Sequence, residues 1–434
     1  MIKARWIEEL APPELEKIIR RSRLDIESEK PRILWILEDV RKRGDAALID
    51  YTARFDGVTL TTKQIPVSQR EIRDAYAQTR KDIISALETA AKNIAKFHSQ
   101  QLPRESWSMQ VTSGVKVGRV RRPIDSVGIY IPGGRAAYPS TVLMIAIPAK
   151  IAGVPNIVAC TPPMRDGRVM PFTLVAADIA GIDKIYRVGG AQAIAAMAYG
   201  TDTIPKVDKI VGPGNIYVTA AKMLVYGQVD IDFPAGPSEI LILADKTADP
   251  ETVAVDLMSQ AEHDPTAAAV LVTTSEALAR KVEAKLDKLV VECRSEIIKT
   301  AISNNGALLM AKTLEDAVDF VNKYAPEHLE IITVNPLKLL KKIRNAGSIF
   351  LGPYSPVSAG DYATGANHVL PTGGDAKIYS GLSVDDFLKH PTFQMLSRAG
   401  LAKLSKTVIT LAEAEGLPSH ARSVENRLKR KVCG

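Results

Sequence analysis

Hydrophobic and polar positions in the central third of the chain follow two alternating periods. Short apolar runs end in turns rich in glycine or proline, and Ala-rich stretches with helical spacing follow them. The expected strands are 126–131, 156–160, 184–188 and 209–211, and the expected helices are 141–151, 173–179, 191–199 and 216–225. Strand, turn and helix repeated at about 30-residue spacing predict a parallel, doubly wound sheet.

The same pattern resumes after residue 239. We expect strands at 240–243, 268–273, 306–309 and 329–332, and helices at 253–262 and 278–291. Before the central third, residues 31–98 have helical spacing, and residues 57–60 between them look extended. Near the end, we expect helices at 393–398 and 411–415, and a last helix that begins near Ser419.

The length of the chain, 434 residues, exceeds what one ordinary core holds. We therefore predict an α/β fold of two Rossmann-like parallel-sheet domains, one inserted in the other, with a short N-terminal arm and a helical C-terminal tail. The expected bounds are 1–25 for the arm, 26–127 with 239–380 for the discontinuous domain, 128–238 for the inserted domain and 381–434 for the tail.

Composition narrows the class of protein. Hydrophobic content of 46% and charged content of 24% are typical of a globular protein in water, and no apolar run reaches the ~18 residues of a membrane span. The N-terminus lacks the apolar stretch of a signal peptide. The three cysteines, Cys160, Cys293 and Cys433, show no CxxC spacing, which argues against disulfides or a thiolate zinc site. We expect a cytoplasmic protein.

The net charge is 56 − 49 = +7. Lysine and arginine are spread along the chain, so we expect no nucleic-acid partner. The one tight basic run, 427–431, is interpreted as part of a solvated terminal helix.

Three segments concentrate groups that can do chemistry. Residues 358–372 place Asp361, Asn367 and His368 within eight positions among glycines, which is typical of a functional loop. Residues 260–265 and 324–329 add further histidines and carboxylates. Together they predict a metal site with an acid/base group beside it.

The helix expected after Asp249 begins with good capping residues, since Asp249 suits the N-cap and Pro250 the first helical position. Within it, Gln260 and His263 are i, i+3 neighbours whose side chains can converge on one point. Histidine is an ordinary zinc ligand, and a glutamine amide is a weaker one. A surface role for the pair is the alternative.

Pro326 fixes the backbone before Glu327 and His328. Histidine titrates near neutrality and suits a general base, although a helix start with a capping glutamate would give the same pattern. Further on, Glu415 and His420 lie on the rim of an expected turn, where either could be a plain surface residue.

The glycine-rich turns of the central sheet suit a dinucleotide, but the usual fingerprint is absent. Gly212-Pro213-Gly214 is followed by Tyr217 where a third glycine is required, and no acidic residue closes the strand that ends at Cys160. Helix N-termini after Gly134, Gly190 and Gly214 could still hold a pyrophosphate.

From about residue 30 onward the chain resembles the histidinol dehydrogenase family. The segments that carry the resemblance are 128–135, 188–194, 212–215, 232–239, 259–263, 326–328 and 361–372. The resemblance implies an NAD-dependent oxidation of L-histidinol, through histidinal, to L-histidine, which is the last step of histidine biosynthesis.

The resemblance also implies the site residues and their roles. One zinc per subunit would be held by Gln260, His263, Asp361 and His420, the last from the partner subunit of a homodimer with shared active sites. Substrate would contact these four residues and Ser238, His328, His368 and Glu415. NAD would contact Tyr130, Gln192 and Asn215. His328 would be the general base, and Glu327 would activate water.

Three alternatives remain open from the sequence. The nearest is a related zinc and NAD dehydrogenase of another small alcohol. A zinc hydrolase with Glu327 as its base is disfavoured by the NAD-contact positions. A non-catalytic nucleotide-binding protein is disfavoured by the acid/base pair.

Overall fold

The computed structural model describes residues 2–21, 26–133, 138–234 and 236–429, and these residues form two units. Unit 1 comprises residues 1–101 and 125–386, and unit 2 comprises residues 102–124 and 387–434. Unit 1 contains two parallel sheets.

The first sheet has five parallel strands in the order β7-β6-β5-β8-β9. Their bounds are β5 Ser126–Tyr130, β6 Asn156–Cys160, β7 Lys184–Tyr186, β8 Lys209–Val211 and β9 Asp230–Ile231. The connecting helices are α6 Pro139–Ala152, α7 Pro171–Ile179, α8 Gly190–Tyr199 and α9 Ile216–Val225. The strand order runs outward from β5 in both directions, so this sheet is doubly wound as predicted.

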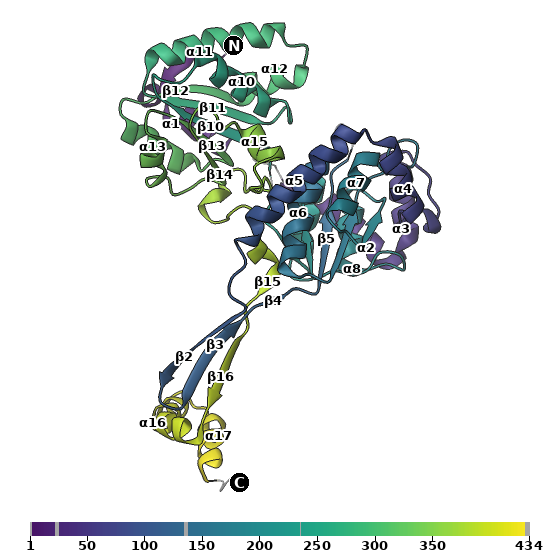
Figure 1. The fold of residues 1–434 in the computed structure, drawn as a ribbon, viewed down its shortest axis with the longest axis vertical. Coiled ribbons are helices and arrows are strands. Elements are labelled where there is room, and N and C mark those ends of the chain that lie inside the picture. Colours follow the sequence, from purple (N-terminus) through teal and green to yellow (C-terminus); the bar gives the residue numbers. More distant parts are fainter. Residues whose placement is uncertain (1, 22–25, 134–137, 235, 430–434) are drawn as a thin grey trace. The chain divides into compact units, whose positions relative to one another are not determined.

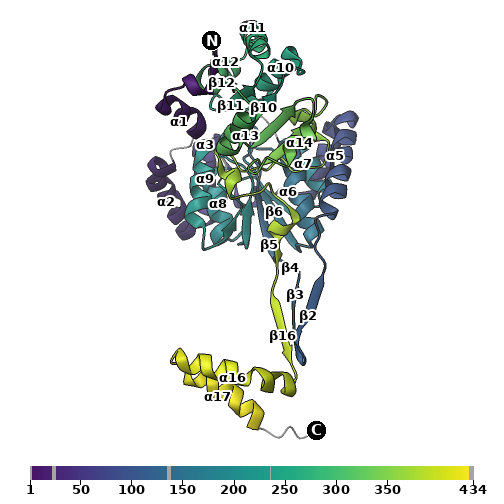
Figure 2. The same cartoon turned by 90° about the vertical axis from the view of Figure 1, so that its left-hand side faces the viewer.

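Helices lie on both faces of this sheet (Figure 2). The N-terminal helices that share in covering it are α2 Ile26–Arg43, α3 Asp45–Asp56, α4 Gln69–Gln78 and α5 Lys81–Ser99. Ile33, Leu37 and Val40 of α2 are buried in one core with residues of α8 and α9. Residues 26–127 were expected to belong to the same domain as residues 239–380, and this was wrong for these helices. An apolar stripe in the sequence shows which face of a helix is buried but not which element packs against it.

The segment expected to be extended at 57–60 forms no strand; Val58 and Leu60 are buried in a loop.

The second sheet has six parallel strands in the order β1-β12-β11-β10-β13-β14 (Figure 1). The strands are β1 Ala4–Trp6, β10 Glu239–Ala244, β11 Ala268–Thr273, β12 Gly306–Met310, β13 His328–Ile332 and β14 Ser348–Leu351. The helices are α10 Pro250–Ala261, α11 Glu276–Glu292, α12 Glu296–Asn305, α13 Leu314–Tyr324, α14 Pro336–Leu340 and α15 Val357–Tyr362. Alternate residues of β10 enter two different cores, Ile240 and Ile242 on one face and Leu241 and Leu243 on the other, so both faces are covered.

The N-terminal residues are part of this sheet rather than a separate arm. Strand β1 pairs in parallel with β12, and α1 Pro12–Arg20 packs its partly buried side chains, Leu15 among them, against the core under α13. The prediction of an arm over 1–25 missed this because one short strand and one short helix give a weak periodic signal.

Unit 2 contains a three-stranded antiparallel sheet in the order β16-β3-β2, with β2 Ser106–Thr112, β3 Val115–Val120 and β16 Thr392–Leu396. The short strands β4 Arg122–Pro123 and β15 Leu388–Lys389 pair with each other, and α16 Arg398–Ala414 and α17 Pro418–Lys429 follow. The helix expected at 393–398 was wrong: Phe393 pairs with Gly118, where a Cβ would lie 2.4 Å from the Phe393 ring. The helical C-terminal tail is confirmed over the described residues 398–429.

Among the helices that the structure describes, none combines the length and the apolar character needed to cross a membrane. The α/β class with parallel sheets is confirmed.

Candidate active site

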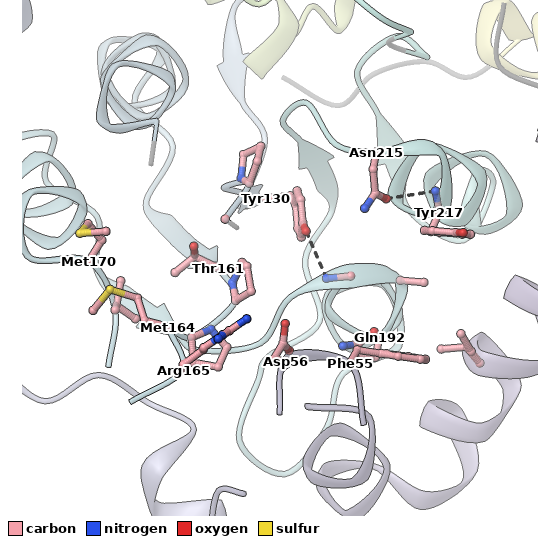
Figure 3. A pocket seen from close by; sticks show the side chains of 18 of the residues that line it. Phe55, Asp56, Tyr130, Thr161, Met164, Arg165, Met170, Gln192, Asn215 and Tyr217 are labelled. Atoms are coloured by element: carbon pink, nitrogen blue, oxygen red, sulfur yellow. Dashed lines mark hydrogen bonds between the residues drawn. The ribbon is translucent and has the colours of Figure 1, made fainter. Parts of the chain in front are cut away.

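A pocket of about 850 Å³ opens at the carboxyl ends of β5, β6 and β8 in the five-stranded sheet (Figure 3). The three residues predicted to contact NAD, Tyr130, Gln192 and Asn215, all line it. Strands β5 and β8 are neighbours whose connections leave in opposite directions, and open α/β sheets bind ligands at such a point.

Tyr130 closes one side of the pocket. It is the last residue of β5 and only 4% exposed, and its hydroxyl accepts a hydrogen bond from the Gly190 N–H at 3.1 Å. Burial raises the pKa of Tyr130 to about 12, so the phenol stays protonated. Gly190 has φ +64°, and a Cβ there would lie 2.7 Å from Gln192 Oε1. The turn therefore requires glycine in order to keep Gln192 in place.

Asn215 is the N-cap of α9. Its Oδ1 accepts from the N–H groups of Tyr217 and Val218, both at 3.1 Å. Helices α8 and α9 thus both begin at the pocket, where their positive ends favour an anionic ligand. This agrees with the phosphate positions predicted after Gly190 and Gly214; the one predicted after Gly134 begins outside the described residues.

A second cluster lies at the amino ends of β10 and β13. Glu327 and His328, at the start of β13, are 5% and 4% exposed. His328 Nδ1 donates to the Glu239 carbonyl oxygen at 3.0 Å, so in the neutral form of the ring Nε2 is the nitrogen with the lone pair. Nε2 is buried without a hydrogen-bond partner among the described residues and lies 3.7 Å from Asp361 Oδ1.

Opposing effects set the charge of His328. Burial lowers its pKa, but the carboxylate of Glu327, 3.5 Å from Nδ1, and that of Asp361 outweigh burial and hold the pKa well above its ordinary value. A base between two carboxylates is strengthened, and it becomes neutral more readily when one of them is neutralised.

The carboxylate of Asp361, in α15, interacts electrostatically with three imidazoles. Burial raises its pKa, but His328, His368 and His263 together lower it below the usual value. His368 Nδ1 donates to the Asp361 carbonyl oxygen at 2.9 Å, and His368 Nε2 lies 3.2 Å from Thr141 Oγ1 of α6. Burial lowers the pKa of His368. The segment 358–372 was predicted as a loop, but it is helical as far as Tyr362, in α15. Its Asp361 lies close to His328 of the segment 324–329.

The spacing predicted that Gln260 and His263 share one helix face, and this prediction was wrong. Helix α10 ends at Ala261, and the His263 N–H donates to the Gln260 carbonyl oxygen in the turn that follows. Gln260 is 2% exposed with Nε2 lacking a hydrogen-bond partner, whereas His263 is exposed. The expected N-cap is confirmed, since Asp249 accepts from the Thr252 N–H at 2.8 Å.

No group of three or more histidines, cysteines, aspartates or glutamates with metal-binding geometry occurs in the described ranges. The predicted set contributes only one histidine and one aspartate from unit 1, together with the Gln260 amide. The Asp361 carboxylate, which neighbouring imidazoles hold ionised, the His263 imidazole and the side-chain oxygen of the buried Gln260 form a donor set of oxygen and nitrogen that fits Zn²⁺.

Sequence reasoning missed the network that holds Glu327. Both Glu239 carboxylate oxygens pair with the Arg21 guanidinium, which also lies 3.7 Å above the ring of Tyr324. The Glu239 N–H donates to Glu327 Oε2 at 2.7 Å, and the Glu327 N–H donates to Glu239 Oε1 at 3.1 Å. Arg21 belonged to the supposed arm, where no local pattern marks it.

The remaining predicted residues divide between the units. Ser238 directly precedes β10, and its carbonyl accepts from the Ala268 N–H at 3.2 Å. Glu415 and His420 lie in unit 2, exposed, at the end of α16 and in the first turn of α17.

Comparison with known proteins identifies the family. The histidinol dehydrogenase family profile matches residues 19–428. A histidinol dehydrogenase of Methanothermobacter thermautotrophicus is 54% identical over 416 residues, covering 96% of this chain and 97% of its own. One from Methanocaldococcus jannaschii is 51% identical over 98% of both chains. The crystal structure of histidinol dehydrogenase from Elizabethkingia anophelis is 42% identical, with a TM-score of 0.93 over 99% of this chain and 98% of that one. The chain is therefore an oxidoreductase that belongs to the histidinol dehydrogenase family.

Proposed function

We propose that this protein oxidises L-histidinol through histidinal to L-histidine, the last step of histidine biosynthesis, with two NAD consumed. The observation that carries the chemistry is the buried Glu327–His328 pair, whose imidazole has a fixed donor on Nδ1 and an unpartnered Nε2. The names of the relatives supply the substrate.

His328 Nε2 is the proposed proton acceptor in both half-reactions. In the first, it takes the hydroxyl proton of the alcohol. Glu327 then takes a proton from the water that adds to the aldehyde, and His328 takes a proton again as the hydrate becomes the acid. NAD, when bound in the pocket lined by Tyr130, Gln192 and Asn215, would accept one hydride in each half-reaction.

Gln260, His263, Asp361 and His420 of a partner subunit would hold zinc, whose contribution when bound would be to orient the substrate. Of the two carboxylates that raise the pKa of His328, Asp361 would be neutralised by that cation, which favours the basic form. Ser238, His368 and Glu415 are the further proposed substrate contacts.

Helix α6, which packs on the five-stranded sheet, contacts this cluster. His368 Nε2 lies 3.2 Å from Thr141 Oγ1 of α6. The side-chain amide of Asn367 donates to the Met144 carbonyl oxygen of the same helix at 2.6 Å. We propose that residues 128–238 carry the NAD contacts, since Tyr130, Gln192 and Asn215 line the pocket there, and that residues 239–380 carry the catalytic pair and the metal ligands of unit 1.

Unit 2 supports a homodimer with shared sites. Trp107 and Met109 occupy alternate positions of the edge strand β2, and Val111 follows at the register irregularity between Gln110 and Thr112. The three are 49%, 55% and 60% exposed and offer an apolar surface that a second copy would cover. Glu415 and His420 are likewise exposed. A cytoplasmic location stays a prediction, based on the sparse cysteines.

The test is NADH formation by the purified protein with and without L-histidinol. We expect turnover with histidinol, its loss on treatment with a chelator that leaves circular dichroism unchanged, and recovery on addition of zinc. Turnover of another small alcohol but not of histidinol would replace this function with the nearest alternative. Full activity in protein shown by elemental analysis to be metal-free would contradict the zinc assignment.

A further inference from the structure

The pocket at the five-stranded sheet contains two buried acceptors without donors. In the described part of the chain, no hydrogen bond reaches Asp56 Oδ2 or Gln192 Oε1, although both residues line the pocket. Figure 3 shows them around the same part of the cavity as Tyr130. An acceptor that is buried and unpaired costs free energy, and a ligand that brings hydrogen-bond donors would remove that cost.

Asp56 is poorly placed for stability. It is the last residue of α3, where the negative end of the helix dipole disfavours a carboxylate. Burial raises its pKa to about 6, and no cation opposes this effect. A residue that destabilises the fold at such a position is a candidate for function.

In common dinucleotide-binding sheets, an acidic residue at the end of the second strand accepts a hydrogen bond from a ribose hydroxyl. Here the corresponding strand, β6, ends in Cys160 and is followed by Thr161. We propose that Asp56, supplied by α3 instead, accepts a ribose hydroxyl of the dinucleotide and excludes a 2′-phosphate, so that it selects NAD over NADP. The inference rests on the proposed function of the pocket.

A 2′-phosphate carries close to two negative charges at neutral pH, and the Asp56 carboxylate would repel it. Two arginines, Arg32 and Arg165, also line the pocket and offer partners for phosphate once that carboxylate is removed. Replacing Asp56 should therefore change the selectivity as well as the affinity.

The experiment measures dissociation constants for NAD and NADP by calorimetry, without alcohol, for wild type, Asp56→Asn and Asp50→Asn. Asp50 is an exposed residue of the same helix that pairs with Arg43 at 2.6 Å, so its variant is the matched control. Loss of a hydrogen bond to a charged group predicts about 10- to 100-fold weaker NAD binding in Asp56→Asn. The NADP to NAD affinity ratio should rise at least tenfold, and the control should match wild type.

NAD binding by Asp56→Asn within twofold of wild type would overturn the inference, and so would an equal loss for both nucleotides. Because the wild type is measured alongside, failure of the proposed function is distinct: wild-type protein that binds no NAD at all would contradict both. Asp56→Glu, which keeps the charge, should retain the preference for NAD even where its affinity falls.

Discussion

Burial and neighbouring charges have opposite effects on the pKa of His328, the proposed general base. The ring is 4% exposed, which lowers its pKa, yet the carboxylates of Glu327 and Asp361 hold that pKa well above its ordinary value. Its Nδ1 bond to the Glu239 carbonyl oxygen fixes the orientation, so only Nε2 is available to a substrate. Glu239 also positions Glu327, whose Oε2 accepts a hydrogen bond from the Glu239 N–H.

The two residues should separate in kinetics. Hydration follows the first hydride transfer, so Glu327→Gln should slow aldehyde-to-acid conversion more than alcohol-to-aldehyde conversion. His328→Ala should slow both, because both release a proton; losses of about 10²–10⁴-fold are typical of a general base. Single-turnover assays started from histidinol and from histidinal measure the two steps.

Glu315→Gln is the control, since Glu315 is an exposed residue of α13 that pairs with Lys342 at 2.8 Å. Small and equal effects of Glu327→Gln and His328→Ala, similar to this control, would remove the pair from the mechanism.

Asp56 gives a prediction for stability and pH. Its pKa rises from the ordinary ~4 in the unfolded chain to about 6 in the folded protein. The fold therefore favours the protonated form, and the stability contributed by Asp56 is present below pH ~4 and lost as pH rises through about 6. Asp56→Asn should be more stable than wild type above that pH, by on the order of 1 kcal/mol after allowance for partial exposure.

Thermal unfolding at pH 4.5 and 7.5 measures this difference, which should grow with pH. A difference that is constant or shrinks as pH rises would show that the Asp56 carboxylate is not disfavoured by the fold.

At the scale of elements, the sequence predicted most strands and helices but not which elements they pair with or pack against. Residues 156–160, 209–211 and 268–273 form strands with the predicted bounds, because apolar β-branched runs between turns have few alternatives. The packing of α2 and the place of β1 depend on tertiary contacts, which no local period encodes.

The candidate site was likewise predicted only in part. The resemblance pointed to Glu327 and His328 and to three residues of the pocket, and the structure places Glu327, His328, Asp361 and His368 close to one another. Gln260 and His263 were predicted to share a helix face, but the helix ends between them. Arg21 and Asp56 could not be found from spacing, because each acts through neighbours that are distant in sequence.

The N-terminal segment should matter for catalysis through Arg21. Its guanidinium neutralises the buried Glu239, which holds the backbone and carboxylate of Glu327. Arg21→Gln should lower kcat more than it changes KM and should affect the aldehyde step most, and it should destabilise the fold by about 3–5 kcal/mol, since it leaves a buried carboxylate unpaired.

Arg20→Gln is the matched control, because Arg20 is the preceding residue and its exposed side chain pairs with Glu16. The double variant Arg21→Gln/Glu239→Gln should regain stability, since the unpaired charge is gone. Equal kcat in the Arg21 and Arg20 variants would show that the network is structural alone.

At the scale of the whole molecule, the predicted ligand and substrate residues fall in two units. His263 belongs to unit 1 and His420 to unit 2. If His420 completes the site of a partner subunit, a two-fold dimer contains two shared sites.

Mixing inactive His263→Ala and His420→Ala chains under refolding conditions tests this arrangement. In a heterodimer one site receives both defects and the other none, so activity should return to as much as half of the wild-type level. Heterodimers that form, as shown by a tag on one chain, and yet remain inactive would mean that His420 serves its own subunit.

One protein is proposed to carry out both oxidations on one substrate. The most direct measurement is the yield of NADH per L-histidinol in a reaction run to completion with excess NAD, with the product identified by chromatography. We predict two NADH per histidinol, with histidine as the product and no lasting histidinal. One NADH per histidinol with accumulating aldehyde would contradict the assignment of the second oxidation to Glu327 and His328.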